Sequence, residues 1–138
     1  MLILSIEIKT KMSQDQQITT EVILKVGEKE FKAKFNNSTT AQDVLSKLPY
    51  TVNLDQYEFD YCGIIPAPLA FDEADKHNGW TNGDICLADN YFTILYAGEE
   101  QSASHTGLIK IGEVEDKNQL SEIKNLGSNI RLTVSRSV

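Results

Sequence analysis

The chain has 138 residues, of which 41% are hydrophobic and 24% are charged, which are ordinary proportions for one globular domain. A chain of this length buries about two thirds of its unfolded surface, so it needs neither a metal nor a disulfide to fold. Its formal net charge of −7 argues against nucleic acid as a partner, because affinity for a phosphate backbone depends on clustered lysine and arginine.

The first residues form an apolar run, residues 2–8 (LILSIEI), followed by a polar segment over residues 11–17. Glu7 interrupts the run and no basic segment precedes it, so it is shorter than a signal peptide or a membrane span requires. We therefore expect a soluble, cytoplasmic protein without membrane contact. Residues 1–19 are interpreted as a lead to a domain over residues 20–138. Within that lead, residues 2–8 form either an edge strand or part of a poorly ordered segment.

Residues 20–35 predict a β-hairpin. Apolar side chains such as Val22 and Leu24 alternate with polar ones in the first half, and Phe31 and Phe35 alternate with lysines in the second. This period of two is typical of strands with one buried face. Gly27 begins the short connection between them, as a tight hairpin turn requires.

A short amphipathic helix is predicted next, over residues 39–48. Thr39 followed by Gln42 matches a capping box, and Val44 and Leu48 recur at helical spacing. Pro49 ends the helix. A helix this short is unstable alone, so we expect it to pack against the strands.

Further strands are predicted over residues 50–54 and 57–65, where aromatic and aliphatic residues alternate with polar ones. Pro66 and Pro68 exclude the next residues from a central strand, and residues 71–79 are interpreted as an acidic surface loop. A meander of three strands follows over residues 85–88, 91–96 and 108–114. A second short helix over residues 116–124, with Asn118 as N-cap, precedes a last strand over residues 130–134. So many strands in one small domain favour a closed barrel, which has no exposed edges.

Several short motifs occur in a characteristic order: T-A-Q-D at residues 40–43, L-P at 48–49, P-L at 68–69, G-D-I at 83–85 and G-L-I-K-I-G at 107–112. In order and spacing they resemble the bacterial cyclophilin-like domain family of uncharacterised proteins, over nearly all of residues 20–134. The resemblance implies an all-β fold, a closed cyclophilin-like β-barrel of about eight mostly antiparallel strands with two short helices.

True cyclophilins carry an F-H-R motif whose arginine assists rotation about the Xaa-Pro bond. This sequence has no F-H-R, and its two arginines, Arg131 and Arg136, fall near the C-terminus. The resemblance therefore implies no catalytic residue. We expect a non-catalytic binding module for a peptide or small ligand, with weak peptidyl-prolyl cis-trans isomerase activity as the alternative. A structural or oligomerising protein, in which residues 2–8 pair between subunits, is a second alternative.

Aromatic and polar residues in or near loops suggest where such a ligand would bind, because ligand pockets are apolar with a few polar groups. The candidate ligand-binding residues are Tyr61, Trp80, Tyr96, Glu99 and His105. Packing in the core is the alternative role for the aromatic side chains, and a solvated loop position is the alternative for His105.

Metal sites and cofactors are not expected. The acidic run over residues 72–75 does not match the spacing of an EF-hand, because Ala74 and Lys76 stand where ligands are needed. Cys62 and Cys86 do not form a Cys-x-x-Cys pair. We interpret both as small buried side chains, with a disulfide between adjacent strands as the alternative.

Overall fold

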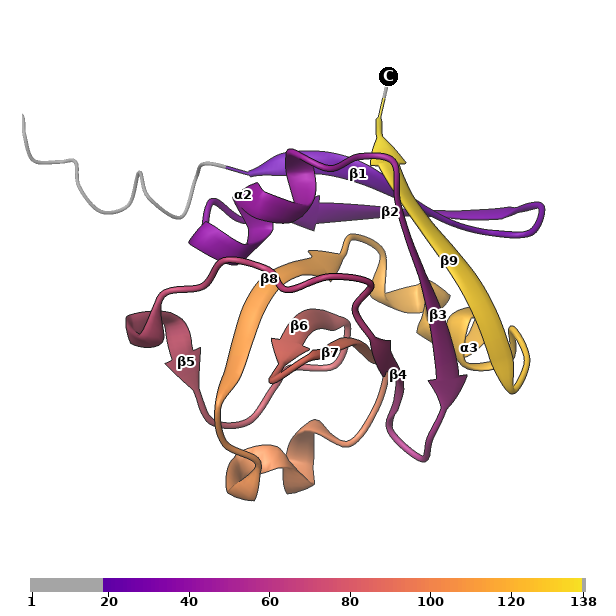
Figure 1. Cartoon of the computed structure of the whole chain (residues 1–138). Coiled ribbons are helices and arrows are strands. Elements are labelled where there is room, and N and C mark those ends of the chain that lie inside the picture. The colour runs from indigo at the N-terminus through magenta and orange to yellow at the C-terminus, as the bar shows by residue number, and fades with distance from the viewer. Residues whose placement is uncertain (1–18, 138) are drawn as a thin grey trace, which may run out of the picture.

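The computed structural model describes residues 19–137, which form a single nine-stranded antiparallel sheet in the order β2-β1-β9-β3-β4-β7-β6-β8-β5. A further pairing between β2 and β8 closes eight of the strands into a barrel, from which β5 extends beside β8 (Figure 1). The predicted all-β fold, a closed barrel of about eight mostly antiparallel strands, is therefore confirmed. The elements are β1 (Thr20–Val26), β2 (Lys29–Phe35), α2 (Thr39–Leu45), β3 (Tyr50–Gln56), β4 (Asp60–Ile64), η2 (Glu73–Asp75), β5 (Lys76–His77), β6 (Asp84–Ala88), β7 (Tyr91–Leu95), η3 (Glu99–Ser104), β8 (Leu108–Val114), η4 (Lys117–Gln119), α3 (Leu120–Lys124) and β9 (Asn129–Arg136).

The N-terminal hairpin forms as its alternating pattern predicts. Val22, Leu24, Phe31 and Phe35 are all buried inside the barrel, whereas the lysines between them are exposed. Val26 pairs with Lys29 across the turn, where Gly27 adopts a φ of 59° that a side chain would disfavour. Burial of one face thus fixes which side of this ribbon faces the core.

Strands β6, β7 and β8 differ from the hairpin because both of their faces are covered. Leu87 and Phe92 point into the main core of the barrel, while Cys86, Leu95 and Leu108 form a second apolar cluster on its outer surface. This double burial explains why β6 and β7 read as nearly continuous apolar runs in the sequence. The three predicted strands are confirmed, but their predicted arrangement as a meander is wrong, because β8 pairs with β6 and the other neighbour of β7 is β4.

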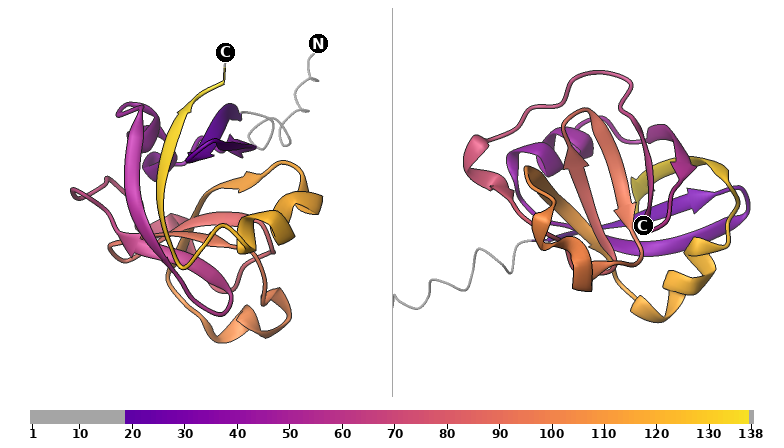
Figure 2. Two further views of the ribbon diagram at one scale, coloured as in Figure 1. Left: turned by 90° about the vertical axis from the view of Figure 1, so that its right-hand side faces the viewer. Right: turned by 90° about the horizontal axis from the view of Figure 1, so that it is seen from below.

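The two α-helices lie at opposite ends of the barrel (Figures 1 and 2). α2 connects the end of β2 to the start of β3, and α3 lies where β3 ends and β9 begins. Antiparallel pairing places the end of β6 and the start of β8 at the same barrel end as α2. That barrel end contains the pocket described below.

Some predicted boundaries are wrong. The N-cap of α2 is Ser38, whose Oγ accepts a hydrogen bond from the Ala41 N–H at 3.2 Å, and not Thr39. The strand predicted from residue 57 begins at Asp60, because residues 57–59 form the turn between β3 and β4. The 3-10 turn η4 is capped by Asp116 instead of Asn118.

The two cysteines are free thiols. Cys86 is buried as predicted, but Cys62 is only half-buried. Both pair in register with Thr93 of β7, one from each side, so an entire strand separates them. Two inter-strand spacings amount to about 10 Å, which exceeds the reach of a disulfide.

The expected strand over residues 2–8, and the subunit pairing suggested for it, lie outside the described residues and stay predictions. Within residues 19–137, no helix is long and apolar enough to cross a membrane.

Candidate functional site

Two of the five sequence-predicted site residues point into the barrel, and the other three lie in loops and a 3-10 helix outside it. Tyr61 and Tyr96 point into the barrel, where their rings meet edge-on with centroids 5.6 Å apart. Tyr61 is fully buried, and its hydroxyl donates to the Gly127 carbonyl at 2.8 Å. The Tyr96 hydroxyl donates to the carbonyl of Tyr57. Both tyrosines are thus engaged in core packing and in anchoring neighbouring loops.

Trp80 lies on the outer face of the barrel, against the second apolar cluster of Cys86, Leu95 and Leu108. Its indole Nε1 donates to the Ala97 carbonyl at 2.8 Å. The exposed His105 ring lies over the indole, with centroids 5.1 Å apart. The structure therefore brings Trp80 and His105 together and separates them from Tyr61 and Tyr96 by the thickness of the sheet.

Glu99 ties the loop that carries Trp80 to η3. Its Oε1 accepts a hydrogen bond from the Asn82 N–H at 2.7 Å, and its own N–H donates to Asn82 Oδ1 at 3.0 Å. Ser102, also in η3, accepts from the Trp80 N–H at 3.0 Å. These reciprocal bonds fix the Trp80 loop against the barrel and occupy the Glu99 carboxylate.

Asp60 is a residue that the sequence does not single out. It begins β4, beside Phe59, whose ring lies 6.4 Å from that of Trp80. Burial raises the pKa of the Asp60 carboxyl to about 6, and the charge of nearby His105 offsets part of that rise. In the sequence Asp60 reads as an ordinary polar position of an alternating strand, so its burial could not be foreseen.

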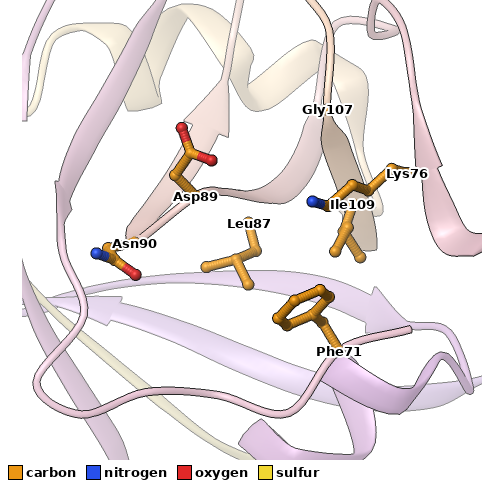
Figure 3. A pocket seen from close by; sticks show the side chains of 7 residues that line it. All are labelled: Phe71, Lys76, Leu87, Asp89, Asn90, Gly107 and Ile109. Carbon is orange, nitrogen blue, oxygen red and sulfur yellow. The ribbon is translucent and has the colours of Figure 1, made fainter. Parts of the chain in front are cut away.

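A second region, at the barrel end that carries α2, forms an open pocket of about 380 Å³ (Figure 3). Leu87 and Ile109 pair directly across β6 and β8 and belong to the main core, so the floor of the pocket is the end of the barrel interior. The lining comes from three separate segments: Phe71 and Lys76, then Leu87, Asp89 and Asn90, then Gly107 and Ile109. None of these residues was among the sequence-predicted site residues.

The segment that carries Phe71 is held in place by α2. The Ala70 N–H donates to Asp43 Oδ2 at 2.8 Å, and Thr40 Oγ1 donates to the Ala70 carbonyl at 2.8 Å. The Asp43 carboxylate also forms an ion pair with Lys47. This ion pair and the hydrogen bond from Ala70 hold the pKa of Asp43 below its ordinary value. One wall of the pocket is therefore fixed by side chains of the first helix.

Two charged side chains line the pocket. Lys76 Nζ lies 5.1 Å from the centroid of the Phe71 ring and 3.0 Å from Glu73 Oε2. Asp89 occupies the tight turn between β6 and β7 with a φ of 52°. In Figure 3 the Lys76 ammonium and the Asp89 carboxylate lie on either side of Leu87.

Neither arginine is among the residues that line this pocket. Arg131 and Arg136 lie on β9, which runs between β1 and β3. Within residues 19–137, no three histidine, cysteine, aspartate or glutamate side chains are grouped in a way that could hold a metal ion. The pocket has an apolar floor, an aromatic wall and charged groups at its rim. This combination is typical of a site that binds a small molecule.

Comparison with known proteins agrees with this architecture. A family model described as the Cyclophilin-like family matches residues 24–135. Among solved structures, the solution structure of a hypothetical protein from Archaeoglobus fulgidus matches with a TM-score of 0.66 and 10% sequence identity, covering 91% of this chain and 100% of that chain. At this identity the structural match supports the fold alone. No curated protein matches the sequence.

Proposed function

The chain belongs to the cyclophilin-like family, and on that premise we propose that it is a non-catalytic binding module for a small ligand. The ligand would occupy the pocket at the barrel end that carries α2. This replaces a groove beside Trp80 as our proposed location, because the indole there is already engaged with the second apolar cluster, the Ala97 carbonyl and His105.

One observation carries the proposal: a cavity of about 380 Å³ opens directly onto core side chains of the barrel. Pockets for small molecules have volumes of about 300–1,000 Å³ and combine an apolar lining with a few polar groups. Leu87 and Ile109 supply the apolar floor, and Phe71, with 50% of its surface exposed, supplies an aromatic wall that packing inside the chain leaves open.

Prolyl isomerase activity gains no support from the positions of the arginines. The isomerase mechanism needs a guanidinium beside the substrate amide, and Arg131 and Arg136 both lie on β9, away from the pocket lining. We therefore propose binding without catalysis.

The proposal is tested with three small probes that each carry one phenyl ring: 2-phenylethylamine, 2-phenylethanol and 3-phenylpropanoate. A ligand that binds only the folded chain, present at about 100 times its Kd, stabilises it by about 2.7 kcal/mol. We expect at least one probe to raise the Tm of the wild type and to lose this effect in Phe71→Ala.

The matched control is Tyr57→Ala. Tyr57 is an aromatic side chain of similar exposure, 57%, in the turn between β3 and β4 and outside this pocket. The probe that stabilises the wild type should stabilise Tyr57→Ala to the same extent. Equal stabilisation of wild type and Phe71→Ala, or none by any of the three probes, would contradict the proposed pocket.

A further inference from the structure

We infer that the pocket selects small molecules that carry an ammonium group on an apolar body. This inference rests on the proposed function, since it concerns the ligand class of the same pocket. It follows from the different situations of the two charged residues that line the cavity, Lys76 and Asp89.

The positive charge of Lys76 is already compensated. Its Nζ lies 3.0 Å from Glu73 Oε2 and stands over the face of Phe71, 5.1 Å from the ring centroid. An ion pair and a cation–π contact therefore hold this ammonium group, and a ligand carboxylate would have to compete with Glu73 for it.

Asp89, by contrast, is exposed to solvent and has no partner side chain among the described residues. Among residues 19–137, no salt bridge and no side-chain hydrogen bond engages its carboxylate. With Lys76 and Glu73 cancelling each other, Asp89 leaves the rim of the pocket with a net negative charge. A protonated amine is the group that fits this position, because charge-assisted hydrogen bonds to a carboxylate are stronger than neutral ones.

The surroundings reinforce this selection. Asp72 and Asp75 lie in the same segment as Glu73 and Lys76, and the whole chain has a formal net charge of −7. A field of this sign raises the local concentration of cations and lowers that of anions. The apolar floor of Leu87 and Ile109, together with the Phe71 ring, would receive the uncharged body of the ligand.

The shape of the turn makes a clean test available. Asp89 has a φ of 52°, a conformation that asparagine tolerates about as well as aspartate does. Asp89→Asn therefore removes the charge while it keeps the turn and the size of the side chain. Asp75→Asn is the matched control, because it removes one negative charge from the neighbouring segment without altering the lining.

The three probes named above share a phenyl ring and differ in charge, so calorimetric titration of each reports the charge preference directly. We expect 2-phenylethylamine to bind about tenfold more tightly than 2-phenylethanol, the contribution of one charge-assisted hydrogen bond. Asp89→Asn should remove this advantage and leave the alcohol unaffected, whereas Asp75→Asn should retain most of it. Added NaCl should weaken binding of the amine alone.

A second variant tests the inference without changing Asp89. Glu73→Gln releases the Lys76 ammonium from its ion pair, so the affinity for 3-phenylpropanoate should rise relative to the wild type. No gain for the carboxylate probe in Glu73→Gln would contradict the compensation that we assign to Lys76.

The outcomes separate this inference from the proposed function. Tightest binding of the carboxylate or the alcohol to the wild type, with loss in Phe71→Ala, would overturn the inference and leave the pocket as the binding site. An unchanged amine preference in Asp89→Asn would also overturn the inference. Failure of all three probes to bind would overturn both.

Discussion

The imidazole of His105 lies against the indole of Trp80, with ring centroids 5.1 Å apart and ring planes inclined by 55°. Backbone hydrogen bonds hold the two residues in place. The Gly79 N–H donates to the His105 carbonyl at 2.9 Å, and the His105 N–H donates to the Ser102 carbonyl at 2.9 Å. Two loops that follow different strands are thereby joined over the outer face of the barrel. Trp80 packs against the second apolar cluster, and His105 packs against Trp80.

If Trp80 covers this cluster, its removal should expose the thiol of Cys86. Burial raises the pKa of Cys86 to about 12, so the thiol is protonated and unreactive in the native protein at neutral pH. In a Cys62→Ala background, where Cys86 is the only cysteine, we expect Trp80→Ala to label with Ellman's reagent much faster than the parent. We also expect a loss of about 2–4 kcal/mol in the free energy of unfolding.

Trp80→Phe is the control, because a phenyl ring keeps most of the cover. It should label slowly. Equal labelling rates for Trp80→Ala and its parent would show that the indole does not protect the cluster.

The half-buried Asp60 makes stability depend on pH. Burial raises its pKa from 3.8 to about 6, so between these values the folded protein binds more protons than the unfolded chain. The free energy of unfolding should therefore fall as the pH rises through this range, by about 1–3 kcal/mol in total. Urea titrations across the range should show this decline in the wild type and a flatter profile in Asp60→Asn.

His105 should modulate that titration. Its charge lowers the pKa of the Asp60 carboxyl, against the larger effect of burial. In His105→Gln we expect the pKa of Asp60, followed through its side-chain carbon resonance by NMR, to lie higher than in the wild type. A lower pKa in this variant would contradict the proximity of the two groups.

Two buried tyrosines should respond oppositely to loss of the hydroxyl. Tyr50 is 5% exposed, and its hydroxyl has no hydrogen-bond partner within the described part of the chain. The Tyr61 hydroxyl donates to the Gly127 carbonyl at 2.8 Å and lies 3.2 Å from the Lys124 carbonyl. We expect Tyr61→Phe to lose about 1–2 kcal/mol in urea unfolding and Tyr50→Phe to retain or gain stability, because an unpaired buried hydroxyl is itself costly. Equal losses in both variants would contradict the difference in hydrogen bonding.

Lys110 compensates a buried carboxylate. Its Nζ lies 3.2 Å from Asp84 Oδ1 and 2.8 Å from Glu113 Oε1, and Asp84 is only 3% exposed. These contacts raise the pKa of Lys110 despite its partial burial. Lys110→Met would leave Asp84 without its cation and should reduce the free energy of unfolding by about 1–3 kcal/mol, since Lys110 itself is partly solvated.

A double variant checks the origin of that loss. Adding Asp84→Asn to Lys110→Met removes the uncompensated charge, so thermal unfolding should show part of the stability restored. If the double variant loses the sum of both single effects, the pair is not coupled.

Eight of the nine strands and the all-β class follow from local patterns in the sequence, whereas β5 (Lys76–His77) lies within residues 71–79, which we interpreted as a surface loop. In the hairpin, Val22, Leu24, Phe31 and Phe35 alternate with polar residues, and only a ribbon with one buried face satisfies that pattern. Turn-forming residues around Asp89 and Gly107 correctly predicted the end of β6 and the starts of β7 and β8. These patterns are local, so they predict a strand without information about which strands it pairs with.

Contacts between side chains that are distant in the sequence depend on how the strands pair. Tyr61 and Trp80 look alike in the sequence as aromatic residues near loops, but Tyr61 faces the barrel interior and Trp80 lies outside it. Likewise, Phe71 and Leu87 line one pocket with Ile109 because β6 pairs with β8 and the β2–β8 pairing closes the barrel. Register and closure are properties of long-range pairing, and an alternating pattern specifies the face of a strand without specifying its neighbour.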